Sequence, residues 1–286
     1  MLVSIVIPTY NARLLLTECL RSLENQDYED FQVVVNDDPR STDGTEELVD
    51  VMRDRGMRIE YLRDNTSMAQ GRSKGAEMAD GELILHLDSD MEVSRGLLAE
   101  CVDLIESGCD ALVVPEVSFG STFWARCRWL ERKCYEGVEP LEALRCVRGA
   151  VYRELGGHNP EMIYFEDKDF DIRVRRRGYV VGRTNEIIYH NEGQLSLMDI
   201  LRKRVEYARS AVVAARYYPK EIRWRASMWN RYRLFVENGR LFLSHPVLGL
   251  GTLFMKTCEF AVSGFHFFSA TRQYGWPRGS GSTDVS

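Results

Sequence analysis

Two aspartates separated by a single serine, Asp88 and Asp90, follow a run of aliphatic residues at 83–87. A short apolar run bounded by Gly81 is typical of a buried strand. Two carboxylates with no basic side chain beside them suit a hard cation such as Mg²⁺ or Mn²⁺, which can also hold a diphosphate. The alternative is an ordinary turn with a helix cap. The elements that surround the pair decide between these interpretations.

Strands and helices alternate through the first 115 residues, and this alternation predicts right-handed crossovers and a mostly parallel sheet. The expected strands cover residues 2–7, 31–35, 58–62, 83–87 and 111–114. Polar or acidic residues follow three of them, at Thr9–Asn11, at Asp37 and Asp38, and at the Asp88/Asp90 pair. We expect these groups to meet at one edge of the sheet. Neither a Gly-x-Gly-x-x-Gly motif nor a Walker loop follows the first strand, so dinucleotide and P-loop chemistry are poorly supported.

A second dense stretch, at 164–177, carries four acids in the six residues from Glu166 to Asp171 and then several arginines. A carboxylate in such a stretch could act as a general base that removes the proton of an attacking hydroxyl. The alternative is an acidic helix start and a basic helix end, which suit the helix dipole. His190 follows a strand-like segment at 186–189, and a lone histidine there is more often structural than functional.

The 286 residues suit one large domain, or a domain of about 200 residues with an appendage. The net charge of −6 is unevenly distributed, because residues 1–201 carry 23 Lys/Arg against 38 Asp/Glu whereas residues 202–240 carry 11 against 3. Charge segregated in this way suggests that the two parts face different partners. Seven scattered cysteines without a Cys-x-x-Cys pair argue against zinc and favour a reducing, cytoplasmic setting without a signal peptide.

A series of motifs in a fixed order resembles the glycosyltransferases of family 2, which have the GT-A fold. The resemblance covers roughly residues 2–190. The matching pieces are Val3–Asn11, Val33–Asp38 with Ser41–Thr45, Gln70–Gly75, Leu87–Asp90, Gly149–Val151, Gly156–His158 and Phe165–Asp169. The resemblance implies an inverting transfer of a sugar from a nucleoside diphosphate donor, UDP- or GDP-linked, to an acceptor.

The resemblance also implies roles for the donor site. Tyr10, in the segment with Pro8 and Thr9, matches the position that packs on the base. Asp37 or Asp38 matches the acid that reads the base edge. One extra residue before Asp43 leaves open which of the two does so. Arg72 matches an arginine near the base or the diphosphate, with a solvated helix residue as the alternative.

For the chemistry, the resemblance implies that Asp90 binds Mg²⁺ or Mn²⁺ directly. Asp88 is then a second metal ligand or a ribose contact, and Ser89 belongs to the donor site. A cation here would neutralise the charge that builds on the departing diphosphate. Asp167 matches the general base, with Glu166 supporting it, and His190 matches a histidine that approaches the metal in some members.

The resemblance fades after residue 195. Two helices rich in Arg, Tyr and Trp are expected at 196–217 and 220–243, followed by apolar runs at 241–255 and 261–268. Pro246, Lys256 and Glu259 interrupt these runs, and none reaches the roughly 20 residues of a spanning helix. We expect short interfacial helices on a membrane surface, with a cap or homodimer contact as the alternative. No nucleic-acid recognition motif is visible.

Together these observations predict an α/β protein with a mostly parallel, GT-A-like (Rossmann-like) sheet flanked by helices, and with an α-helical C-terminal extension. The expected domains are 1–194 (donor half 1–115, acceptor half 116–194), 195–275, and a disordered tail at 276–286. The expected function is metal-assisted glycosyl transfer to a lipid-linked or glycan acceptor, peripheral at the inner face of the cell membrane. The alternatives are a non-catalytic nucleotide-sugar-binding scaffold and a nucleotidyltransferase.

Overall fold

The computed structural model describes residues 1–139, 141–162 and 165–274, so the tail predicted at 276–286 lies outside the described residues. The chain divides into two compact units. The sheet unit comprises Met1–Val117, Glu142–Glu161 and Glu166–Asn191, and the helical unit comprises the described residues of Ser118–Leu141 and Met162–Phe165 together with 192–274. Residues 118–141, which the sequence analysis placed with the acceptor half, thus pack within the helical unit.

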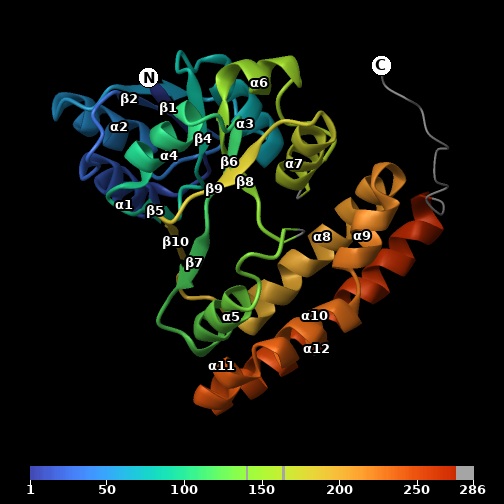
Figure 1. The fold of residues 1–286 in the computed structure, drawn as a ribbon. Helices are drawn as coiled ribbons and strands as arrows, with labels where there is room; N and C mark the ends of the chain where they lie inside the picture. Colours follow the sequence, from blue (N-terminus) through green and yellow to red (C-terminus); the bar gives the residue numbers. More distant parts are fainter. Residues whose placement is uncertain (140, 163–164, 275–286) are drawn as a thin grey trace. The chain divides into compact units, whose positions relative to one another are not determined.

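The sheet unit is built around a seven-stranded sheet in the order β3-β2-β1-β4-β8-β6-β9 (Figure 1). Its strands are β1 (Val3–Thr9), β2 (Phe31–Asp37), β3 (Ile59–Leu62), β4 (Leu83–His86), β6 (Ala111–Val113), β8 (Leu144–Arg148) and β9 (Val181–Arg183). Strand β1 pairs in parallel with β2 and β4, whereas β8 is antiparallel to both of its neighbours. The prediction of a mostly parallel sheet is therefore confirmed.

Helices cover both faces of this sheet. They are α1 (Arg13–Glu24), α2 (Thr45–Asp54), α3 (Met68–Glu77), α4 (Leu97–Glu106), α6 (Gly149–Glu154) and α7 (Glu166–Arg176). Successive strand residues point to opposite faces, so Ile5 and Ile7 of β1 join one core with α1, α2 and α4, while Val6 joins a second core with Val151 of α6 and Phe170 of α7. Strands buried on both faces explain why their sequences are continuously aliphatic.

A smaller sheet has the order β5-β10-β7, with β5 at Met91–Val93, β10 at Ile188–Asn191 and β7 at Glu116–Phe119. Strands β10 and β5 are antiparallel, and His190 pairs with Met91. The backbone N–H of Asn191 donates to the carbonyl oxygen of Asp90 at 2.8 Å. This sheet therefore holds His190 beside the turn that carries Asp88 and Asp90.

The helical unit contains α5 (Phe123–Lys133), α8 (Leu197–Tyr217), α9 (Pro219–Arg225), α10 (Met228–Glu237), α11 (Gly239–Ser244) and α12 (Pro246–Tyr274). Helix α8 begins with a capping box between Ser196 and Asp199, close to the expected start. The single helix predicted at 220–243 is wrong, because that segment forms α9, α10 and α11. Ser227 breaks the run, since its side chain accepts the backbone N–H of Asn230 and starts a new helix there.

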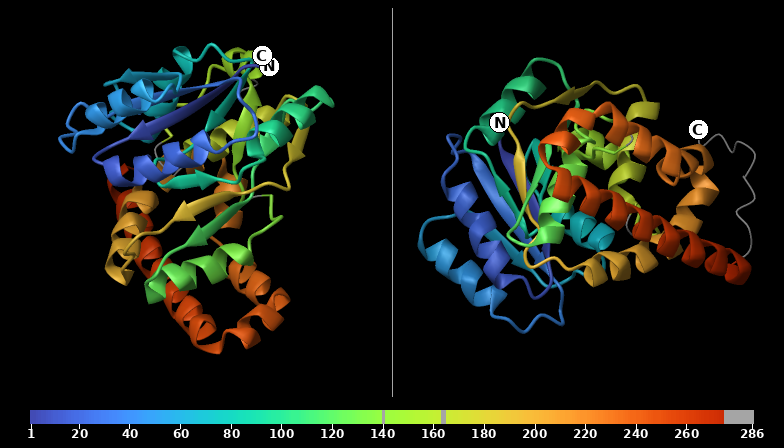
Figure 2. Two further views of the ribbon diagram at one scale, coloured as in Figure 1. Left: turned by 90° about the vertical axis from the view of Figure 1, so that its left-hand side faces the viewer. Right: turned by 90° about the horizontal axis from the view of Figure 1, so that it is seen from below.

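The prediction of short apolar helices after residue 241 is also wrong, because residues 246–274 form one continuous helix of 29 residues, which lies along α8 and α5 (Figures 1 and 2). Pro246 does not interrupt this helix, since proline is tolerated in a first turn. Lys256 and Glu259 do not interrupt it either, since both are buried in ion pairs. Within the described ranges, no helix combines the length and apolarity that a membrane crossing needs.

Candidate active site

The ends of β1 and β2 are joined by the carboxylate of Asp37. The hydroxyls of Thr9 and Ser41 donate to its Oδ1 at 2.7 Å each, and the Tyr61 hydroxyl donates to its Oδ2 at 2.9 Å. Asp37 is 1% exposed. Its carboxylate therefore holds three elements together and presents no open face to a ligand.

Asp38, the next residue, lies in a different environment. Arg40 donates to both of its oxygens, from Nε at 2.8 Å and from Nη2 at 2.5 Å, and these bonds lower the pKa of Asp38 to about 2. The Arg40 guanidinium also lies over the ring of Tyr10, 5.3 Å from its centroid, and the Tyr10 side chain is 54% exposed. An open aromatic face and an ionised carboxylate thus lie on neighbouring loops, bridged by one exposed arginine.

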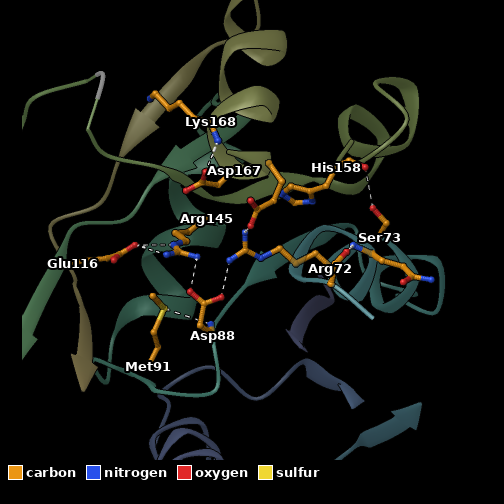
Figure 3. A network of polar contacts seen from close by, with 12 residues as sticks. Arg72, Ser73, Asp88, Met91, Glu116, Arg145, His158, Asp167 and Lys168 are labelled. Carbon is orange, nitrogen blue, oxygen red and sulfur yellow. Dashed lines mark hydrogen bonds and ion pairs between the residues drawn. The ribbon is translucent and has the colours of Figure 1, made fainter. Parts of the chain in front are cut away.

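The carboxylate of Asp88 lies between two guanidinium groups (Figure 3). Arg72 Nη2 is 2.6 Å from its Oδ1, and Arg145 Nη1 is 3.4 Å from its Oδ2. Burial alone would raise the pKa of Asp88, but the two arginines outweigh that effect and hold the pKa at about 2. Asp88 is therefore ionised and already neutralised by the protein.

Asp90 differs from Asp88 in that one of its carboxylate oxygens makes no hydrogen bond to another described residue. Its Oδ1 is buried and has no hydrogen-bond partner among the residues that the structure describes. Its Oδ2 is 3.3 Å from Nε2 of His190, and Nδ1 of that ring is 3.6 Å from Oε2 of Glu116. An unpaired buried carboxylate oxygen is costly unless a ligand completes it.

The residues present fit a divalent cation that takes only one or two of its ligands from the protein. Across the described ranges, no group of three or more His, Cys, Asp or Glu side chains is arranged to hold a metal. Mg²⁺ commonly takes only one or two carboxylates and completes its shell with substrate phosphates and water. Asp90, with its open Oδ1, meets that requirement better than Asp88.

Helix α7 begins at the two acids Glu166 and Asp167. Arg72 Nη1 donates to Glu166 Oε1 at 2.9 Å, while Glu166 Oε2 is buried and has no hydrogen-bond partner within the described part of the chain. Burial raises the pKa of Glu166 to about 7, since the charge of Arg72 offsets it only in part. Asp167 is only partly buried, and its Oδ1 accepts the backbone N–H of Lys168 at 2.7 Å. Of the two acids, Asp167 is the more accessible.

Two residues of this network, Arg145 and Glu116, were missed by sequence reasoning. Arg145 of β8 donates to Oε1 of Glu116 from Nε at 2.8 Å and from Nη2 at 2.6 Å, and it also approaches Asp88. Figure 3 shows this chain of contacts from Glu116 through Arg145 and Asp88 to Arg72. An arginine within a short buried strand was the available signal, because a buried charge needs a partner.

Two further predicted donor-site residues have other surroundings. Pro8 is buried in β1 and packs closely against Gly71 of α3. The approach is so close that a methyl group added to Gly71 would lie 2.9 Å from the Pro8 Cβ. Ser89 lies half-buried in the turn between the two aspartates. The structure therefore gives Pro8 a packing position and places Ser89 at the edge of the acidic turn.

Similar proteins are glycosyltransferases. The chain is 32% identical over 109 residues to a GalNAc(5)-diNAcBac-PP-undecaprenol beta-1,3-glucosyltransferase of Campylobacter jejuni, covering 37% of this chain and 35% of that one. It is 34% identical over 116 residues to the poly(ribitol-phosphate) beta-N-acetylglucosaminyltransferase TarS of Staphylococcus aureus, covering 39% and 20%. The aligned part thus spans about a third or less of these relatives.

Solved structures share the fold over nearly the whole chain. The mannosyltransferase PcManGT from Pyrobaculum calidifontis, in complex with GDP-Man and Mn²⁺, has a TM-score of 0.64 at 16% identity and covers 93% of this chain and 86% of its own. S. aureus TarS 1-349 in complex with UDP has a TM-score of 0.55 at 18% identity and covers 99% and 95%. These likenesses confirm the predicted GT-A fold. A family model described as glycosyl transferase family 2 matches residues 4–179. The chain therefore belongs to glycosyl transferase family 2.

Proposed function

We propose that the protein transfers a sugar from a nucleoside diphosphate donor to an acceptor, with inversion and with help from a divalent cation. The observation that carries the proposal is the difference between the two acids of the Asp88–Asp90 turn. Asp88 is neutralised by two arginines, whereas Asp90 keeps a buried oxygen open. Similar proteins support the donor class, since solved relatives are titled as complexes with UDP, UDP-GlcNAc and GDP-Man.

Donor recognition is assigned to Tyr10 and Asp38. A planar base stacks on the exposed Tyr10 ring, and Asp38 accepts hydrogen bonds from the base edge once Arg40 swings aside. Arg40 can do so because its side chain is 72% exposed. We prefer Asp38 to Asp37 for this role, because the oxygens of Asp37 already accept three hydroxyl donors.

Asp90 is assigned to the cation, which supplies neutralisation of the charge on the departing diphosphate when bound. His190 contributes by holding Oδ2 of Asp90, and Glu116 fixes the other side of the His190 ring. Arg72 and Arg145 keep Asp88 ionised and hold its side chain in place within the turn that also carries Asp90. Asp88 is thus a positioning residue or a ribose contact rather than the principal ligand.

Asp167 is assigned as the general base. Its carboxylate takes the proton of the acceptor hydroxyl while that oxygen attacks the anomeric carbon and the bond from this carbon to the diphosphate oxygen breaks. A single displacement of this kind inverts the anomeric configuration. Glu166, which is buried against Arg72 at 2.9 Å, orients Arg72 instead of touching the acceptor.

Similar proteins support the acceptor class, since they include a glucosyltransferase of an undecaprenol-linked oligosaccharide and an N-acetylglucosaminyltransferase of poly(ribitol-phosphate). We assign this chain a lipid-linked or polymeric acceptor in envelope glycan synthesis.

A thermal-shift screen tests the donor assignment. We expect UDP or GDP to raise the melting temperature more in the presence of Mn²⁺ or Mg²⁺ than in its absence, because selective binding stabilises the native state. We expect Asp38→Asn to reduce the shift. If neither nucleotide changed the melting temperature with either cation, the proposed donor class would be wrong.

A further inference from the structure

Helix α12 exposes large apolar side chains on one face, while two of its charged side chains are buried with Leu248 and Met255 on the other. Its charged residues Lys256 and Glu259 are 5% and 2% exposed. By contrast, five large apolar residues of the same helix are more than half exposed: Val247 at 69%, Leu250 at 71%, Phe254 at 56%, Phe265 at 72% and Phe268 at 60%. An ordinary surface helix would instead present charged or polar side chains on its exposed face.

These five residues, called here the α12 stripe, lie on one face of the helix. Their spacings of three, four, eleven and three residues follow the helical repeat, and the exposed Ala261 continues the face between Phe254 and Phe265. At 1.5 Å per residue the stripe extends over about 31 Å. It is thus a long, narrow apolar surface and not a set of isolated exposed side chains.

The rotation of α12 is fixed by ion pairs inside the helical unit. Lys256 bonds to Glu131 of α5 and to Glu259 of its own helix. Glu259 is in turn 2.6 Å from Arg128 of α5 and 3.2 Å from Arg204 of α8. Turning the stripe inward would break these pairs and leave charges uncompensated, which is strongly unfavourable. These ion pairs therefore keep the stripe on the surface of the helical unit.

Helix α10 adds basic and aromatic side chains beside the stripe. The hydroxyl of Tyr232 lies 2.6 Å from that of Thr257, which is on the exposed side of α12 midway along the stripe. The same helix carries Trp229, 77% exposed, and Arg233, whose side chain is 68% exposed. Exposed Trp and Arg on a helix that adjoins an apolar surface suit the polar–apolar boundary of a bilayer.

Two observations favour a lipid surface over a second copy of the chain. A stripe about 31 Å long and about 10 Å wide offers about 310 Å², well below the roughly 800 Å² per partner of a standard interface. A two-fold dimer would also place the same surface on both partners. Helices α10 and α11, which adjoin α12 and carry three arginines and one glutamate, would then oppose each other. An anionic bilayer, in contrast, complements this charge.

We infer that the α12 stripe lies in the interface of an anionic membrane, with the arginines of the adjoining helices α10 and α11 at the lipid phosphates. The helix would lie in the plane of the surface and would not cross it. The inference does not depend on the proposed transfer reaction, since the stripe belongs entirely to the helical unit.

Vesicle flotation of the full chain tests this inference. We expect the protein to float with vesicles of phosphatidylcholine and phosphatidylglycerol, and to float less with phosphatidylcholine alone or at high salt. The double variant Leu250→Asp/Phe254→Asp should lower partitioning by at least about 10-fold, because it removes two exposed apolar side chains that would enter the lipid. Leu14→Asp is the matched control, since Leu14 is 84% exposed on α1 of the sheet unit and should leave flotation unchanged.

If circular dichroism shows that the double variant is unfolded, Phe265→Ser, a milder change on the same stripe, replaces it. We expect Phe265→Ser to lower flotation by less than the double variant would. The inference is overturned if the wild-type chain does not float with anionic vesicles, or if the folded stripe variants float as well as the wild type. Sedimentation equilibrium adds a third outcome. A wild-type dimer that the stripe variants dissociate would assign the surface to a second copy and would also overturn the inference.

Discussion

Nη1 of Arg145 lies 3.4 Å from Oδ2 of Asp88, although 57 positions separate the two residues in the chain. With Arg72 on the other oxygen, this contact satisfies Asp88 within the protein. The two acids of one short turn thus acquire different roles from their neighbours, since only Asp90 keeps a buried oxygen open. The predictions below follow from that difference and from the charges that surround it.

Arg145 should be needed for activity without touching the donor. Arg145→Lys retains the positive charge but loses the fork that bonds Glu116 twice. We expect a loss of about 10- to 100-fold in transfer, the range found when a residue that supports a metal site is replaced. Steady-state kinetics checks this prediction, and transfer at the wild-type rate would show that the Glu116–Arg145–Asp88 chain has no positioning role.

Asp167 should be required for transfer and dispensable for donor binding. Asp167→Asn removes the base while keeping the shape, so we expect transfer to fall by about 10²- to 10⁴-fold. Nucleotide affinity, measured by calorimetry, should stay within a few-fold of the wild type. If Glu166→Gln abolished transfer while Asp167→Asn spared it, the base would instead be Glu166.

Glu166 should make the folded state less stable as pH rises. Its ordinary pKa of 4.5 is raised to about 7 in the folded chain, so between these values the native state binds a proton that the unfolded state has lost. Stability from this group therefore falls as pH increases through that window, by about 1.4 kcal/mol for each unit of pKa difference.

Urea unfolding of wild type and Glu166→Gln at pH 5 and pH 8 measures this effect. The variant should gain stability relative to the wild type at the higher pH, and contributions from other groups cancel in the difference. A relative loss at pH 8 would mean that the Arg72 ion pair outweighs the cost of burying the Glu166 charge.

The buried charges of the helical unit should be essential for its stability. Glu259→Gln would leave Lys256, Arg128 and Arg204 undercompensated, so we expect a loss of about 3–5 kcal/mol in the free energy of unfolding. Glu237→Gln is the matched control, because Glu237 forms an exposed pair with Arg233 and should cost about 1 kcal/mol or less. Equal losses in the two variants would contradict the ion-pair account of the α12 rotation.

The sequence was sufficient for β1, β2, β4 and β6, because each is a largely aliphatic run that the fold buries on both faces. It did not predict β8 and β9, in which arginines interrupt the apolar residues. It also placed Thr9, Asp37 and Asp88 at strand ends, since that position follows from local pattern alone. It left Asp37 and Asp38 undistinguished because the Tyr61 hydroxyl reaches Asp37 only in the folded sheet, and the loop conformation that brings Arg40 onto Asp38 has no sequence pattern of its own.

The helical unit was less predictable because its helix boundaries depend on a side-chain cap and on buried ion pairs with distant partners. Periodicity could not show that a side-chain cap at Ser227 would divide 220–243. Nor could it show that Lys256 and Glu259 would find partners on α5 and α8 and so allow one long helix. Charges that look like interruptions in sequence become internal contacts once their partners are assembled.

The central claim, that Asp90 and not Asp88 holds the cation of a nucleoside diphosphate site, has one direct test. Calorimetric titration of the favoured nucleoside diphosphate, with and without Mn²⁺, is measured for the wild type and for Asp90→Asn. The account predicts that Mn²⁺ tightens binding by the wild type and that the variant loses this gain while still binding the nucleotide weakly. An undiminished Mn²⁺ effect in folded Asp90→Asn would contradict it.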